Sequence, residues 1–236
     1  MFYYYGYDWT YIVLVLPCIL FSLWASHSVK RTFEKYSKET NSRGLTGAEA
    51  ARRVLQANGV HNVQIQQVAG DLTDHYDPKA NVIRLSESVY ASTSTAAVGV
   101  ACHEAGHAVQ YAQGYGPIKL RAAIIPITNI GSKLAMPLIL IGLLLEFFAD
   151  ISTIFVMLGV ACFALSLVFQ LVTLPVEFNA SQRAVQTIRE TQLLTDNELE
   201  GAKKTLRAAA MTYVAATAVA LAQVLRLLML FARRRK

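Results

Sequence analysis

Four long apolar stretches limit this chain to folds whose helices are covered by lipid or by one another. Residues 11–24, 134–145, 151–174 and 208–231 contain a single charged residue, Arg226. Each stretch, the second with its flanks, approaches the length that a helix needs to cross a hydrocarbon core of about 30 Å. The chain is also 54% hydrophobic and only 16% charged, which is too apolar for an ordinary soluble domain. The sequence therefore predicts a mainly α-helical membrane protein with about four transmembrane helices.

The two ends of the chain are predicted to lie in the membrane. Residues 1–25 contain no Lys or Arg, so we interpret them as a retained transmembrane anchor with an aromatic belt at residues 2–9, not as a cleaved signal peptide. Residues 209–236 are predicted to form a C-terminal membrane helix with a basic tail. A spanning helix would place this tail outside the cell, against the charge rule. Either the tail's charge is tolerated there, or the helix is tilted within the bundle.

Residues 127–175 are predicted to form a transmembrane hairpin with an acidic turn at residues 146–150. Twelve Lys and Arg residues lie between residues 26 and 133, and five lie between residues 176 and 208. Because basic flanks favour the cytoplasmic side of a membrane, both ends of the hairpin are predicted to be cytoplasmic. The chain is thus expected to be a multi-pass protein of the cell membrane, with the lipid bilayer as its first partner.

The net charge of +6 and the three cysteines exclude other classes of protein. The basic residues form no compact patch interleaved with aromatic residues, so no nucleic-acid partner is expected. Cys18, Cys102 and Cys162 lie in apolar segments without a CxxC pair, which argues against a disulfide framework and against a thiolate zinc site. The number of subunits is left open by the sequence.

Residues 26–126 are more polar and predict a small α+β domain. Thr46 and Glu49 have the spacing of a capping box that starts a short amphipathic helix. Alternating residues near 63–67 and a second extended run at 81–86 predict a two- or three-stranded sheet. The run at 81–86 could be an open edge that pairs with an extended peptide, or an internal strand.

The most specific motif of the chain is an HExxH sequence inside residues 95–111, formed by His103, Glu104 and His107. On a helix, positions i and i+4 share one face, so both imidazoles can bind one metal ion while Glu104 reaches a water molecule on that ion. This is the pattern of a catalytic Zn²⁺ site, with Glu104 as the catalytic general base. Ser92 to Thr95 supply candidate caps for this helix.

A catalytic zinc ion needs three protein ligands, so two histidines leave the site incomplete. Gln110 and Gln113 occupy the places where an HExxHxxGxxH motif would have Gly and the third His. Glu177, in the predicted helical segment 176–208, is our candidate for the third ligand. Pro175 is predicted to begin this helix. Alternatively, Glu177 could pair with Arg183 or cap the helix.

These segments together resemble a known family. The Thr46 capping box, the turn at residues 73–78, the strand at 81–86, the HEAGH helix and the stretch 174–181 are similar to the YugP-like bacterial membrane neutral zinc metallopeptidases. More distantly, the chain resembles the HtpX-like and CAAX-protease-like membrane metallopeptidases, in which an Asp follows the Glu ligand by four residues. This chain has Ser181 at that position. The resemblance implies a zinc peptidase with no defined substrate.

We therefore expect one Zn²⁺ per chain, bound by His103, His107 and Glu177, and a site on the cytoplasmic face. The expected function is hydrolysis of peptide bonds in membrane or unfolded proteins. Two alternatives are an intramembrane zinc protease, with a different acidic ligand, and a non-enzymatic scaffold that uses zinc structurally. His75, Tyr76 and Tyr111 are only candidates for stabilising the oxyanion, and the simpler interpretation of each is a structural role.

Overall fold

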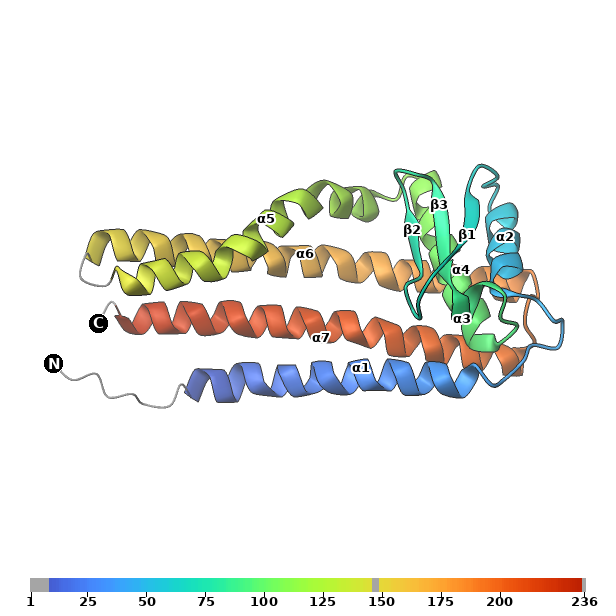
Figure 1. Cartoon of the computed structure of the whole chain (residues 1–236), viewed down its shortest axis with the longest axis horizontal. Coiled ribbons are helices and arrows are strands. Elements are labelled where there is room, and N and C mark those ends of the chain that lie inside the picture. The colour runs from blue at the N-terminus through green and yellow to red at the C-terminus, as the bar shows by residue number, and fades with distance from the viewer. Residues whose placement is uncertain (1–8, 146–148, 235–236) are drawn as a thin grey trace. The chain divides into compact units, whose positions relative to one another are not determined.

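The computed structural model describes residues 9–145 and 149–234 (Figure 1). Most of the predicted aromatic belt at residues 2–9, part of the acidic turn and the last two residues of the basic tail lie outside this range. The described chain divides into two compact units. The first unit takes its residues from Met1–Trp24, Arg121–Thr173 and Thr212–Lys236. The second unit consists of Ala25–Leu120 and Leu174–Met211.

The first unit is made up of the apolar parts of long helices, which also contribute residues to the second unit. A π-helical turn, η1 (Tyr11–Val15), leads into α1 (Leu16–Tyr36), and α5 (Gly116–Leu144) precedes the longer helices α6 (Ala149–Glu190) and α7 (Asp196–Arg234). Within the described residues, four helices are long and apolar enough to cross a membrane: α1 with its preceding turn, α5, α6 and α7. This confirms the prediction of a mainly helical membrane protein, and it shows α7 as one unbroken helix.

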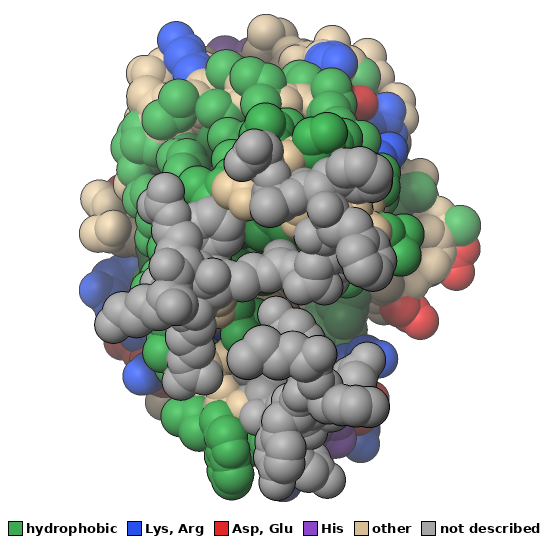
Figure 2. All heavy atoms as spheres, turned by 90° about the vertical axis from the view of Figure 1, so that its left-hand side faces the viewer, with side chains coloured by type: hydrophobic (Ala, Val, Ile, Leu, Met, Phe, Trp, Pro, Cys, Tyr) green, Lys and Arg blue, Asp and Glu red, His purple; other side chains and the backbone are tan. Residues whose placement is uncertain are grey.

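Many large apolar side chains of these helices are exposed. They include Leu20 and Trp24 of α1, Ile130 and Leu140 of α5, and Leu158 of α6. In Figure 2, hydrophobic side chains form much of the visible surface that is not drawn in grey. Exposed apolar surface of this extent is unfavourable in water and is expected where lipid surrounds the helices.

The second unit contains the sheet and the shorter helices. In addition to α2 (Gly47–Ala57), α3 (Glu87–Tyr90) and α4 (Thr95–Ala112), it has the strands β1 (Gln64–Val68), β2 (His75–Asp77) and β3 (Val82–Ser86). The strand order is β1-β3-β2, with β1 parallel and β2 antiparallel to β3. The predicted capping box is confirmed, because Thr46 accepts a hydrogen bond from the Glu49 amide and Glu49 accepts one from the Thr46 amide.

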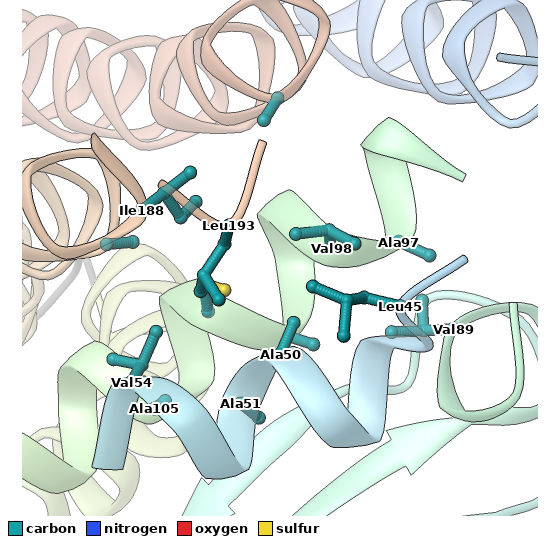
Figure 3. Close-up of a cluster of buried hydrophobic side chains, with 14 of the residues drawn as sticks. Leu45, Ala50, Ala51, Val54, Val89, Ala97, Val98, Ala105, Ile188 and Leu193 are labelled. Atoms are coloured by element: carbon teal, nitrogen blue, oxygen red, sulfur yellow. The ribbon is translucent and has the colours of Figure 1, made fainter. Parts of the chain in front are cut away.

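The core of the second unit lies mainly between α2 and α4, and the end of α6 adds to it (Figure 3). Ala50, Ala51 and Val54 form the buried stripe of α2, as the amphipathic pattern predicts. Small residues on both helices allow their backbones to approach closely. Val98 and Ala105 of α4 complete the contact. This core holds the HExxH helix in place from the side of α2.

For the second unit, the structure decides between two alternatives for one strand and corrects one prediction about a helix. β3 is the central strand, so residues 81–86 cannot be an open edge, and the alternative of an internal strand is correct. Pro175 does not begin a helix, because α6 runs through it from Ala149 to Glu190. A proline inside a helix removes one amide donor but leaves the helix continuous when packing supports both sides. Similarly, α5 runs through Pro126.

Candidate metal centre

The HExxH motif lies in the second half of α4, as the sequence predicts. Ser94 caps this helix by accepting a hydrogen bond from the Ala97 amide, and the helix ends before Gly114, whose φ of +68° is left-handed. His103 and His107 share one helix face, with ring centroids 4.7 Å apart and planes at 80°. Two imidazoles in this arrangement can direct nitrogen lone pairs at one point.

A close approach between α4 and α6 brings the third candidate ligand to these histidines. Gly106 lies against the backbone of Ala180, where an added Cβ atom would stand 2.6 Å from the Ala180 carbonyl oxygen. Ala180 is itself fully buried. Only a residue without a side chain fits at this contact. The Gly inside HEAGH therefore sets the distance between the motif and the turn of α6 that carries Glu177.

Glu177 lies directly beside both histidines. Its Oε2 atom is 3.3 Å from His103 Nε2 and 3.6 Å from His107 Nε2. Tetrahedral zinc, with bonds of about 2.0–2.1 Å, holds neighbouring ligand atoms about 3.3–3.4 Å apart. The two imidazoles and the carboxylate therefore have the chemistry that zinc requires, and both distances to Glu177 Oε2 are close to the spacing of a tetrahedral site. Within the described residues, no other group of His, Cys, Asp and Glu side chains has this arrangement.

The burial of the three side chains is uneven. Glu177 is only 2% exposed, whereas His103 and His107 are 15% and 10% exposed. A carboxylate this deeply buried needs positive charge or hydrogen-bond donors nearby. Burial lowers the pKa of His107, but the hydrogen bond to Glu177 and the nearby carboxylates raise it, so that its pKa lies above the ordinary value. The raised pKa of His107 thus reflects the buried carboxylate beside it.

Ser181 lies four residues after Glu177, at the position where the HtpX-like pattern would have an Asp. Its hydroxyl oxygen lies 3.0 Å from His103 Nδ1, the ring nitrogen that points away from Glu177. A metal-binding histidine usually donates its second N–H to an oxygen atom. A hydroxyl can accept that hydrogen bond, so Ser181 can orient His103 without a carboxylate.

Arg183 does not pair with Glu177. Its Nε donates to Asn179 Oδ1 at 2.7 Å, and its guanidinium also donates to Gln113 Oε1 at 2.5 Å. Glu177 also lies inside α6, far from the first turn of the helix, so it has no capping role. Both alternatives that the sequence left open for Glu177 are therefore wrong.

Glu104 is buried, with 8% exposure, one residue from His103. A second carboxylate, Asp74, accepts hydrogen bonds from the amide and hydroxyl of Ser86. Burial raises the pKa of Asp74, these hydrogen bonds lower it, and the negative charge of Glu104 raises it further, with a net increase. Asp74 thus lies close enough to Glu104 for their charges to interact, which sequence spacing could not indicate.

The candidates for stabilising an oxyanion lie near α4. The Tyr76 hydroxyl donates to Asn81 Oδ1 at 2.8 Å, and the rings of Tyr76 and Tyr111 are 5.6 Å apart. His75 lies on β2, and its Nδ1 atom is 2.8 Å from the carbonyl oxygen of Thr73. Because the Tyr76 proton is already donated, this hydroxyl would have to leave Asn81 before it could bind a substrate oxygen.

Comparison with known proteins shows which family the chain resembles over nearly its whole length. The chain is 48% identical over 221 residues to the "Putative membrane protease YugP" of Bacillus subtilis (strain 168), covering 94% of this chain and 96% of that protein. No solved structure shows a significant match. The sequence pattern of one protein family matches residues 11–232, nearly the whole chain. The chain therefore belongs to the family described as "putative neutral zinc metallopeptidase".

Proposed function

We propose that this protein is a membrane-bound zinc endopeptidase in which His103, His107 and Glu177 bind one Zn²⁺ ion per chain. The observation that carries the proposal is the pair of 3.3 and 3.6 Å distances between Glu177 Oε2 and the two imidazole Nε2 atoms. The histidines and Glu177 lie in segments of α4 and α6 that are separated in the sequence by the whole apolar hairpin. Three protein ligands leave a fourth position open, as catalysis requires.

Glu104 is the general base in this proposal. Bound zinc would polarise the scissile carbonyl group and make a water molecule more acidic. Glu104 would accept the proton of the attacking water and transfer it to the leaving amine. Its burial beside His103 limits the access of bulk water to this carboxylate.

The strand that binds substrate in this proposal is β2. β2 is an edge strand of the sheet, and it contacts α4. An extended peptide could pair with this edge through backbone hydrogen bonds, which recognise no particular side chain. This suits unfolded proteins, or membrane proteins with an extended segment near the bilayer, as substrates. The basic residues on both sides of the hairpin support a site on the cytoplasmic face.

The alternatives are less well supported. An intramembrane protease would need an acidic ligand other than Glu177, and the described residues contain no second cluster that provides one. A structural zinc site would be closed by four ligands. In the described part of the chain, the cluster consists of two histidines and one carboxylate. A zinc scaffold would also have no use for Glu104.

The test is the Glu104→Gln variant of the purified full chain. Zinc content and the cleavage of casein, an unfolded protein, are measured with and without a chelator. The proposal expects the wild-type protein to bind one zinc ion and to lose activity with the chelator. The variant should bind zinc but lose proteolysis, because the amide cannot accept the proton. Wild-type turnover in the variant would contradict the role of Glu104, and a protein without zinc would contradict the site.

A further inference from the structure

Gln110 is a fully buried polar residue one helical turn after His107. Its exposure is 0%, and every polar atom of its side chain has a partner. Oε1 lies 3.0 Å from His107 Nδ1. Nε2 donates to the Val176 carbonyl oxygen and to Asn179 Oδ1, both at 2.9 Å. Val176 immediately precedes Glu177 in α6. One side chain therefore connects a candidate histidine ligand to the helix segment that carries the candidate carboxylate ligand.

The partners of Gln110 determine which way its amide group points. The carbonyl oxygen of Val176 can only accept a hydrogen bond, so the atom that faces it must be the amide nitrogen. The orientation of Asn179 is fixed independently, because Arg183 Nε can only donate and lies 2.7 Å from Asn179 Oδ1. The remaining atom of Gln110, Oε1, must therefore face His107. An amide oxygen only accepts, so His107 Nδ1 carries a hydrogen atom.

We propose that Gln110 is a positioning residue that fixes the tautomer and orientation of His107 and connects α4 to α6 beside Glu177. The inference rests on the proposed function. With the hydrogen atom on Nδ1, the neutral imidazole has its lone pair on Nε2, the atom that lies 3.6 Å from Glu177 Oε2. The ring is thus prepared for a metal ion before one arrives. His103 lacks such a constraint, because the Ser181 hydroxyl can donate or accept.

Three variants separate this positioning role from simple packing. Gln110→Met keeps the approximate size but removes the acceptor for His107 Nδ1. Gln110→Glu keeps an acceptor oxygen there and removes the donors to α6. Asn179→Ala removes one acceptor of Nε2 and leaves the contact between Gln110 and His107. Zinc affinity is measured by competition with a chelator, the unfolding temperature is measured without metal, and the visible spectrum is recorded with Co²⁺ in place of zinc.

Gln110→Met should raise the Kd for zinc by about 10–100-fold and change the Co²⁺ spectrum, since partners of metal-binding histidines typically have effects of this size. Gln110→Glu should be less stable without metal, because a charge is buried beside a carbonyl oxygen, yet bind zinc at least as tightly as the wild type. Asn179→Ala should lower the unfolding temperature while its Kd for zinc stays near the wild-type value.

Each contrary result has a distinct meaning. A wild-type protein that binds no zinc would overturn the proposed function and this inference with it. If the wild type binds zinc and Gln110→Met binds it equally well, only the inference fails. The inference also fails if Asn179→Ala weakens zinc binding as much as Gln110→Met, because packing then explains the effect. If Gln110→Met does not fold, weak zinc binding by Gln110→Glu would still overturn the inference.

Discussion

The contact between Gly106 and Ala180 makes a quantitative prediction about the candidate site. In a Gly106→Ala variant, the new Cβ atom would stand 2.6 Å from the Ala180 carbonyl oxygen, whereas ordinary contacts begin at 3.4 Å. Because this oxygen belongs to the α6 backbone, no flexible side chain can move aside. The two helices must separate locally by about 0.8 Å. Overpacking of this kind typically costs about 1–3 kcal/mol of stability.

The same shift also weakens metal binding. Ligand positions in a zinc site tolerate deviations of only about 0.2 Å, so a separation of 0.8 Å moves Glu177 out of range of an ion held by both histidines. We expect the Kd for zinc to rise at least about tenfold, which corresponds to about 1.4 kcal/mol. The assay is chelator competition on the purified protein, with thermal unfolding measured in parallel without metal.

Two other glycines provide matched controls. Gly99 is also on α4 but packs against α7, where an added Cβ atom would be 3.1 Å from Ala202 Cα. Gly99→Ala should therefore lower stability slightly and leave zinc binding intact. Gly116, at the start of α5, has no atom within 4 Å of an added Cβ atom, so Gly116→Ala should lower neither stability nor zinc affinity. Equal loss of zinc binding in Gly99→Ala and Gly106→Ala, or wild-type zinc binding in Gly106→Ala, would refute the reasoning.

Three further changes test other parts of the structure. Glu177→Gln keeps the shape of the side chain but weakens its oxygen as a ligand, so zinc content after dialysis should fall well below one ion per chain. A variant that still holds one zinc ion per chain would show that Glu177 is not a ligand. Thr46→Ala deletes half of the capping box and should lower the free energy of unfolding by about 1 kcal/mol in denaturant titrations, whereas no change would mean that the cap contributes nothing. The hydrogen bond from Arg84 lowers the pKa of Asp77 to about 2. Because this folded-state pKa is below the unfolded value of about 3.9, Asp77 stabilises the sheet above pH 4 and loses that effect as the pH falls through 2. Hydrogen exchange of β2 and β3 should therefore be faster in Asp77→Asn than in the wild type at pH 6. Equal exchange rates in the two proteins at pH 6 would contradict this role.

Features that depend on nearby residues could be predicted from the sequence. The Thr46 and Glu49 capping box needs only a spacing of three residues, and His103 and His107 share a face because a helix repeats every 3.6 residues. Glu177 could be proposed as a ligand although it lies far from the motif in sequence, because a catalytic zinc ion needs three protein ligands. Each of these inferences uses a rule that does not depend on how distant segments pack.

Features that depend on tertiary packing could not be decided from the sequence. α6 continues through Pro175, and the packing that keeps it continuous cannot be seen in the neighbouring sequence. β3 is internal because β1 and β2 both pair with it, and the sequence did not indicate on which side each strand would lie. Gln110 stood out only as the wrong residue for a third histidine. A useful signal was present, because a polar residue three positions after His107, on an otherwise apolar helix, shares the histidine's face.

The division of the candidate ligands between α4 and α6 has a consequence for the order of events during synthesis. A ribosome makes His103 and His107 first, then the whole of α5 and the first 28 residues of α6, and only then Glu177. A nascent chain that ends within the hairpin can offer zinc the two imidazoles but not the carboxylate. If the three side chains bind zinc as proposed, the complete site can therefore form only after the whole apolar hairpin has been made.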